Sequence, residues 1–221
     1  MKKRGFGTNF HNVYDSDAET YHSFSKIEHF SRKLSIKIHS FLTSGTLLDI
    51  GAGTCHKTNL FSNSFDTVYA LDYSKSQLEF ARSKYNLNKK LHFLWASATD
   101  IPLLDESVDS IIITWGSFPL SEGIKEMMRV LKKGGFIVRI GVVAEDDFTK
   151  LFPAFDIGRV NRINQTFKKY GFTIERHKVA IRFRNLAEAK RVLTKITGTD
   201  ALKIKRTNFE HEVALCYYRK Q

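Results

Sequence analysis

The chain has 221 residues, of which 42% are hydrophobic, and it carries a formal net charge of +12. This length and composition suit one α/β domain with a full core and small additions. The longest apolar stretch, Phe136 to Val143, is short and is interrupted by Arg139, which argues against a membrane-spanning helix. No apolar signal-peptide core follows the basic start of the chain, so the sequence predicts a cytoplasmic protein.

The cysteines and histidines do not form a metal-binding pattern. Cys55 and Cys216 are the only cysteines and make no C-x-x-C pair, and the eight histidines show no H-x-x-x-H spacing. We therefore expect neither a metal site nor a disulfide.

The first 45 residues are expected to be helical, because apolar and aromatic side chains recur there every three or four residues. This stripe extends from Tyr14 to Phe41 and predicts one or two helices before the sheet. We interpret residues 1–45 as a helical cap or lid, and residues 46–221 as a single globular domain.

Five later segments are nearly continuous in apolar residues, as is typical of strands buried on both faces. They lie at 47–50, 67–71, 91–95, 108–114 and 135–142. Helices are expected between them, most clearly at 74–85, which Ser74 is suited to cap, and at 121–131, which a Lys-Lys-Gly-Gly sequence ends. Beyond residue 150 the pattern predicts a helix at 158–170, a strand at 172–183, a helix at 186–196 and a last strand at 209–218.

The sequence LLDIGAGT at 47–54 is the most informative motif, because a short apolar strand leads through Asp49 into two closely spaced glycines. Glycine allows a sharp turn and a close approach of backbone N–H groups to a ligand. A helix that begins near residue 56 adds a favourable position for an anionic group at its N-terminus. By itself this motif is a weak indicator of function.

The next strand ends in Asp72, and its carboxylate is predicted to lie beside the glycine turn. A carboxylate there can accept hydrogen bonds from both hydroxyls of a ribose, each worth on the order of 1.5 to 3 kcal/mol. This pattern suits NAD and S-adenosylmethionine equally well. The dinucleotide fingerprint G-x-G-x-x-G, however, requires a third glycine at position 56, where this chain has His56.

Four segments add a more specific resemblance: LLDIGAGT, ALDYSKSQLEFAR, ASATDIPLLDESVDSIIITWG and MMRVLKKGGFIVRIG. Their order and spacing are similar to those of class I S-adenosylmethionine-dependent methyltransferases, in the broad group that contains the ubiquinone/menaquinone-biosynthesis enzymes. The resemblance covers about Tyr14 to Ile140 and continues weakly beyond. It implies an α/β fold with a doubly wound, Rossmann-like, seven-stranded mixed sheet, in which the last strand inserts antiparallel between two others. It also implies an enzyme that uses S-adenosylmethionine as its cofactor and transfers the methyl group.

The resemblance assigns cofactor binding to the glycine turn and to neighbouring strand ends. The implied residues are Asp49, Gly51, Ala52, Gly53, Asp72, Tyr73, Ser97, Ala98, Asp100 and Thr114. Two positions depart from the family's pattern. Cys55 replaces a third glycine, and a cysteine in the left-handed conformation would cost roughly 1 to 2 kcal/mol. Either its backbone angles are therefore ordinary, or the pocket is altered near the methionine tail of the cofactor. Ser97 replaces a common aspartate that accepts from the adenine amino group, and Asp100 is the expected substitute.

The methyl acceptor is expected beyond the carboxyl ends of the strands, where open α/β sheets bind their ligands. The substrate candidates are Tyr14 and Tyr21 from the N-terminal helices, and Trp115 and Ser117 after the fourth strand. An acceptor that still carries its proton needs a base, for which the candidates are His22, Glu145 and Asp146. A carboxylate acceptor requires none.

The positive charge lies mainly in the last third, since residues 46–150 sum to −1 and residues 151–221 to +10. Basic residues alternate there with aromatic ones, as in Arg182-Phe183-Arg184, which fits either an RNA-binding surface or a solvated face. The predicted function is methyl transfer to a small molecule, which this charge allows to be acidic. One alternative is a tRNA or RNA methyltransferase that uses the basic third. Another is a non-catalytic cofactor- or RNA-binding module, motivated by Cys55 and Ser97, and an NAD-dependent oxidoreductase is a minor competitor.

Overall fold

The computed structural model describes residues 8–42, 44–152 and 155–221. The helices are α1 (Thr8–Ser16), α2 (Ala18–Lys26), α3 (Arg32–Phe41), α4 (His56–Phe61), α5 (Lys75–Tyr85), α6 (Leu120–Val130), α7 (Ile157–Lys169) and α8 (Leu186–Thr197). The strands are β1 (Glu28–His29), β2 (Thr46–Ile50), β3 (Thr67–Asp72), β4 (Leu91–Trp95), β5 (Val108–Thr114), β6 (Leu131–Val142), β7 (Thr173–Arg182) and β8 (Asn208–Arg219). Short 3₁₀ turns lie at η1 (Ser62–Ser64), η2 (Thr149–Leu151) and η3 (Ala201–Lys203).

All the strands form one mixed sheet in the order β1-β7-β8-β6-β5-β2-β3-β4. Strands β2 to β6 pair parallel with one another. Strand β8 lies antiparallel between β6 and β7, which confirms the predicted insertion of the last strand. The doubly wound α/β class is thus confirmed, and the predicted count of seven strands is wrong by one.

The eighth strand is β1, which lies in the segment that the sequence predicts to be helical. Helix α2 ends at Lys26, and Glu28 and His29 then pair antiparallel with Ile181 and Ala180 of β7. The N–H of Arg182 also donates to the carbonyl of Ile27 at 2.8 Å. The free edge of β7 supplies these hydrogen bonds, so the segment extends there and separates α2 from α3, whereas the N-cap Asp17 separates α1 from α2.

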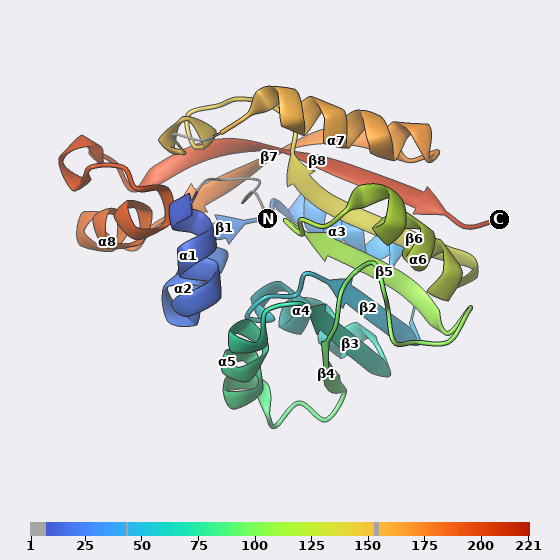
Figure 1. Cartoon of the computed structure of the whole chain (residues 1–221). Helices are drawn as coiled ribbons and strands as arrows, with labels where there is room; N and C mark the ends of the chain where they lie inside the picture. Colours follow the sequence, from blue (N-terminus) through green and yellow to red (C-terminus); the bar gives the residue numbers. More distant parts are fainter. Residues whose placement is uncertain (1–7, 43, 153–154) are drawn as a thin grey trace.

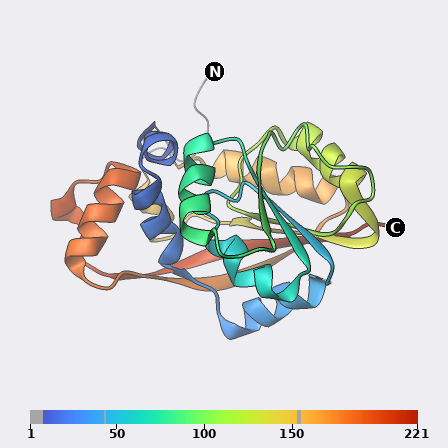
Figure 2. The same ribbon diagram turned by 90° about the horizontal axis from the view of Figure 1, so that it is seen from below.

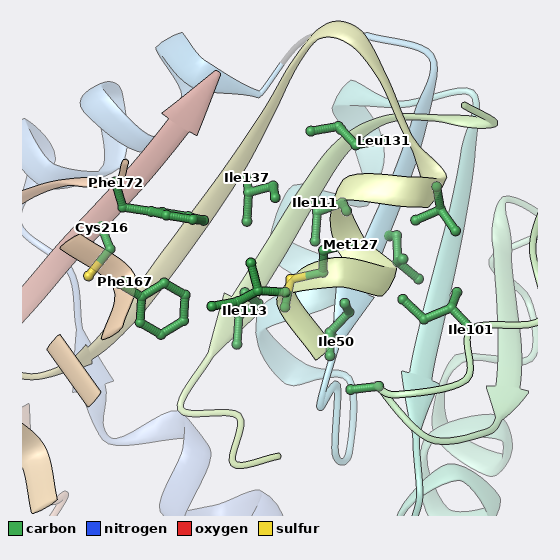
Figure 3. Packing of buried hydrophobic residues seen from close by; sticks show 14 of the residues in the cluster. Ile50, Ile101, Ile111, Ile113, Met127, Leu131, Ile137, Phe167, Phe172 and Cys216 are labelled. Carbon is green, nitrogen blue, oxygen red and sulfur yellow. The ribbon is translucent and has the colours of Figure 1, made fainter. Parts of the chain in front are cut away.

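Two layers of helices cover the sheet. Helices α3, α4 and α5 pack on one face, and α6 and α7 pack on the other, as the view in Figure 2 shows for α3 and α7. Figure 3 shows the second of these interfaces, where Met127 of α6 and Phe167 of α7 meet the isoleucines Ile111, Ile113 and Ile137 of β5 and β6. Burial on both faces explains why the inner strands are nearly continuous in apolar residues.

Helices α1 and α2 lie at the carboxyl ends of the parallel strands and pack against α8 (Figure 1). A third apolar cluster joins them, with Val13 and Ile27 on the N-terminal side and Phe148, Val192 and Phe209 on the other. The N-terminal helices therefore cover the edge of the sheet where α/β proteins bind ligands. No helix among the described residues has the length and apolar character that a membrane crossing needs.

Candidate functional site

The glycine turn after β2 has the backbone conformation that its sequence predicts. Gly51 and Gly53 have φ angles of +73° and +52°, which glycine adopts without a Cβ penalty. The N–H groups of Gly51 and Ala52 both donate to the carbonyl of Leu71 on β3, at 2.8 and 3.1 Å. A Cβ on Gly51 would lie 3.1 Å from the Cα of Gly116 after β5. The turn is therefore fixed against both neighbouring strands.

Cys55 adopts the left-handed conformation, with φ +56° and ψ +23°, at the N-cap of α4. Its side chain is fully buried, and its N–H donates to the carbonyl of Ala52 at 2.8 Å. Of the two alternatives that the sequence left open at this position, the one with ordinary backbone angles is therefore excluded. The turn keeps the geometry of a third glycine, at a conformational cost of about 1 to 2 kcal/mol.

Asp72 lies at the end of β3, and its buried carboxylate is surrounded by donors. Its Oδ2 accepts from the N–H of Gly53 at 2.8 Å and from the hydroxyl of Tyr14 at 2.5 Å, and its Oδ1 accepts from the N–H of Ser74 at 2.8 Å. Burial raises the pKa of Asp72, and the bonds from Tyr14, Ser74 and Gly53 oppose that rise. The structure thus brings Tyr14 of α1, Gly53 and Asp72 together.

Asp49 lies beneath the turn and keeps one oxygen unpaired. Its Oδ2 accepts from the Thr58 hydroxyl at 2.6 Å, whereas its buried Oδ1 has no hydrogen-bond partner among the described residues. Burial raises the pKa of Asp49 to about 7, although the bond from Thr58 opposes this. An unpaired buried acceptor beside a glycine turn fits a ligand with a donor group, such as an amino acid tail.

The predicted adenine contacts differ in burial. Ala98 is buried in the core next to α6, whereas Ser97 and Asp100 are exposed and pair with each other through a backbone bridge. The Ser97 hydroxyl bonds Thr99 at 2.7 Å. Tyr73 follows Asp72 directly and is 55% exposed. Because β3 and β4 are neighbours, these residues lie on the same side of Asp72 and can border a flat ring there.

A cavity extends from the glycine turn toward the acceptor side. It is lined by Gly51, Ala52 and Thr54 of the turn, by Thr114 and Trp115 at the end of β5, and by residues of α1, α2, β1 and the C-terminal third. Six of the lining residues are aromatic: Phe10, Tyr21, Phe24, Trp115, Phe148 and Phe152. Trp115 has a left-handed backbone with φ +62°, a strained conformation that is concentrated at functional sites.

The three predicted bases occupy different environments. His22 is buried and its Nδ1 bonds the Thr54 hydroxyl at 2.9 Å, and desolvation, with Lys84 and Lys26, lowers the pKa of His22 to about 4. Glu145 is exposed and does not line the cavity. Asp146 bonds His211 rather than lining the cavity itself.

Ser117, a predicted substrate contact, also lies outside the cavity. It is exposed, and its hydroxyl accepts from the guanidinium of Arg159 at 3.1 Å. No group of three or more His, Cys, Asp or Glu side chains in the described part of the chain is arranged to hold a metal ion.

Two polar residues of the cavity, Glu28 and His211, are not among the site residues that the sequence predicts. Glu28 on β1 is buried, accepts from the Trp115 indole at 2.9 Å and lies 3.4 Å from the ammonium of Lys57. His211 on β8 is 2% exposed. A signal for His211 exists, because Phe209, His211 and Val213 alternate with Glu210 and Glu212, which places a histidine on the buried face of a strand.

The fold and the glycine turn define a class of protein: a Rossmann-like α/β domain with the strand order and inserted antiparallel strand of class I methyltransferases. Residues 48–139 match the methyltransferase domain family. A demethylmenaquinone methyltransferase from Clavibacter sepedonicus is 37% identical over 95 residues, which are 42% of this chain and 39% of that protein. The ubiquinone/menaquinone biosynthesis C-methyltransferase UbiE from Geotalea daltonii is 27% identical over 146 residues, 60% of this chain and 62% of that protein.

A solved structure of a SAM-dependent methyltransferase from Aquifex aeolicus superposes with a TM-score of 0.61 at 19% identity, covering 91% of this chain and 97% of that one. At this identity the likeness shows the fold alone. Residues 48–139 are therefore similar to the methyltransferase domain family, and the relatives that match this part of the chain include a UbiE protein. The chain spans about 39 to 62% of the length of the two curated relatives.

Proposed function

We propose that the chain is an S-adenosylmethionine-dependent methyltransferase that acts on a small, largely apolar molecule. The observation that carries this is the juxtaposition of a ribose-type carboxylate, Asp72, with the Gly51–Gly53 turn at one end of an aromatic-lined cavity. Asp72 would accept the ribose hydroxyls, and the free Oδ1 of Asp49 is an acceptor for the cofactor's amino acid part. Tyr73, Ala98 and the residues near them would border the adenine.

The cofactor supplies a methyl group with a good leaving group, so the protein mainly needs to align the acceptor with it. Orientation of this kind can lower a barrier by up to roughly 7 to 11 kcal/mol. We propose that α1 and α2 act as a cover over the site, because Tyr14 contacts Asp72 and Tyr21 lines the cavity. Such a cover excludes water from the reacting groups.

The cavity supports a small acceptor better than RNA. Its lining includes six aromatic side chains, and its charged pair is a carboxylate, Glu28, held by Lys57. Several basic residues of the C-terminal third are already paired within the molecule, including Lys195 with Asp17 and Arg206 with Asp147. These pairs favour the interpretation of a solvated basic face, and a buried carboxylate disfavours a strongly acidic acceptor. A cytoplasmic location stays a prediction from the sequence.

Calorimetric titration with S-adenosylmethionine and S-adenosylhomocysteine tests this function. We expect micromolar binding to the wild-type protein and at least about 100-fold weaker binding to Asp72→Ala, because charge-assisted bonds to two hydroxyls are lost. Asp66→Ala is the matched control, since Asp66 is an exposed aspartate at the other end of the same strand region. Absence of binding to the folded wild-type protein would support the non-catalytic alternative. RNA binding that weakens steeply with salt would support the RNA alternative.

A further inference from the structure

Asp146 and His211 form a hydrogen-bonded dyad at the edge of the cavity, in which His211 is buried and Asp146 is half-buried. Nδ1 of His211 lies 2.7 Å from Oδ2 of Asp146. The carboxylate is held by backbone N–H groups on both sides, from Phe148 and Thr149 to Oδ1 and from Glu212 to Oδ2, at 2.9 to 3.0 Å. Its position is therefore fixed, and it fixes the imidazole in turn.

The other ring nitrogen of His211 has no hydrogen-bond partner among the described residues. A carboxylate only accepts hydrogen bonds, so Nδ1 must carry the proton and a neutral ring keeps its lone pair on Nε2. This Nε2 is buried and has no hydrogen-bond partner among the described residues, although His211 lines the cavity. Because the two nitrogens lie on different sides of the ring, Nε2 is directed away from Asp146.

Aromatic rings hold the imidazole in place. The indole of Trp115 stacks on it with centroids 5.3 Å apart and planes 23° apart, and the ring of Phe148 lies at the same distance, tilted by 58°. A histidine that served only the core would have both nitrogens paired, because an unpaired buried polar atom is costly. The arrangement resembles a base that is oriented by a carboxylate and left open toward a substrate.

A second unpaired acceptor lies in the same cavity. Oε1 of Glu28 is buried without a partner among the described residues, while Oε2 of Glu28 accepts from the Trp115 indole. The negative charge of this carboxylate is balanced by Lys57. The cavity therefore presents two acceptors, His211 and Glu28, to a ligand that brings donors.

Building on the proposed function, we propose that His211, positioned by Asp146, accepts the proton of the methyl acceptor. The acceptor is then a flat, largely apolar molecule with a phenol-type or enol-type O–H, or an acidic C–H, at the reacting atom. This assigns the base to a residue other than the predicted His22 and Glu145, and makes Asp146 a positioning residue.

The step balances without a further reactant. When bound, S-adenosylmethionine would supply the methyl group. The oxygen or carbon of the acceptor would form a bond to this methyl group while the carbon–sulfur bond breaks and its electron pair stays on sulfur. The acceptor's proton moves to Nε2 of His211. The resulting imidazolium is stabilised by Asp146 and returns its proton to water when the site opens.

An ionisation-sensitive probe tests this assignment. We would titrate 4-nitrophenol into the protein saturated with S-adenosylhomocysteine, at a pH below the pKa of the free phenol, and record the absorption of the phenolate. The wild-type protein is expected to bind the probe largely as phenolate. His211→Asn keeps an amide donor toward Asp146 and removes the base, so its ratio of phenolate to phenol should fall at least about tenfold, the equivalent of one pKa unit. Asp146→Asn should lower this ratio as well.

His177→Asn is the matched control, because His177 lies beside Glu175 on the neighbouring strand β7 and does not line the cavity. It should leave the probe spectrum unchanged. If His211→Asn does not fold by circular dichroism, His211→Gln replaces it, and Asp146→Asn is a second test of the dyad.

The outcomes distinguish the proposal of methyl transfer from the proposal that His211 is the base. If the protein binds S-adenosylhomocysteine but binds no 4-nitrophenol, or ionises it equally in wild type and His211→Asn, the assigned base and acceptor class are wrong. If S-adenosylhomocysteine does not bind, while 4-nitrophenol alone still ionises in a manner that depends on His211, then methyl transfer is wrong and the proton acceptor stands.

Discussion

The hydroxyl of Tyr14 occupies an acceptor site on Asp72 that the ribose of the cofactor would need. A carboxylate accepts about four hydrogen bonds, and Asp72 already receives them from Gly53, Ser74 and Tyr14, with a further contribution from the N–H of Tyr73. Tyr14 is the side chain among these donors, so it can move without disturbing the glycine turn. The substitution Tyr14→Phe removes the hydroxyl and keeps the ring.

We expect this substitution to change stability and affinity in opposite directions. A hydrogen bond to a charged group contributes about 1.5 to 3 kcal/mol, so Tyr14→Phe should lower the free energy of unfolding by that amount. For a domain of this size, the corresponding fall in Tm is roughly 3 to 12 °C. Binding of S-adenosylhomocysteine should become tighter, by about 10-fold or more, because its ribose no longer has to displace a partner of Asp72.

Thermal unfolding and calorimetric titration measure the two effects on the same preparations. Tyr21→Phe is the control, since the Tyr21 ring lies 4.6 Å from the Tyr14 ring and its hydroxyl is not among the described donors to Asp72. A folded Tyr14→Phe protein with unchanged or weaker affinity would show that Tyr14 does not compete with the ribose. Its hydroxyl would then assist the bound cofactor instead.

Two more perturbations test the turn and the dyad. Gly53→Ala places a Cβ 3.0 Å from a ring carbon of Tyr21, at a residue whose φ is +52°. Urea unfolding should therefore show that the free energy of unfolding falls by about 1 to 2 kcal/mol, and calorimetry should show a weaker affinity for the cofactor. Equal stability would contradict the strain inferred at this position. Burial raises the pKa of Asp146, but the bond and charge of His211, with backbone donors, lower it overall to about 2. A lowered carboxyl pKa stabilises the fold above the unfolded value near 4, and this stabilisation is lost as the pH falls toward 2. Between pH 6 and pH 2.5, urea unfolding should therefore show that the wild-type protein loses about 2 kcal/mol more stability than Asp146→Asn, and identical pH profiles would contradict this.

The sequence predicts the sheet well because the physical signal is strong where strands are buried on both faces. Strand β5, expected at 108–114, has those bounds in the structure, and β3 differs from its expected range by one residue. Strand β1 could not be predicted in this way, because two residues show no periodicity and their pairing depends on the free edge of β7, more than 150 positions away. Contact with a distant edge overrides the local helical pattern there.

The contacts within the site are less predictable than its elements. The glycine turn and Asp72 are close in sequence and belong to one strand-helix-strand unit, so their neighbourhood follows from local pattern. The bond between Tyr14 and Asp72 joins residues 58 positions apart, and the pair of Asp146 and His211 joins residues 65 apart. No periodicity encodes such pairs, and only the buried position of a histidine on β8 gives a local sign of one.

This difference explains why the sequence predicts the class of the protein more easily than it predicts the methyl acceptor. The family match covers residues 48–139, which contain the glycine turn, Asp72 and Trp115. Most aromatic residues of the cavity, together with Glu28 and His211, lie outside that range, in the N-terminal helices, β1 and the C-terminal third. The family match therefore covers the segment that we propose to hold the cofactor, whereas the flanking segments supply most of the remaining cavity lining. The identity of the acceptor is accordingly a question about the chemistry of this cavity, in which two buried acceptors among aromatic rings favour a flat molecule that brings its own donors.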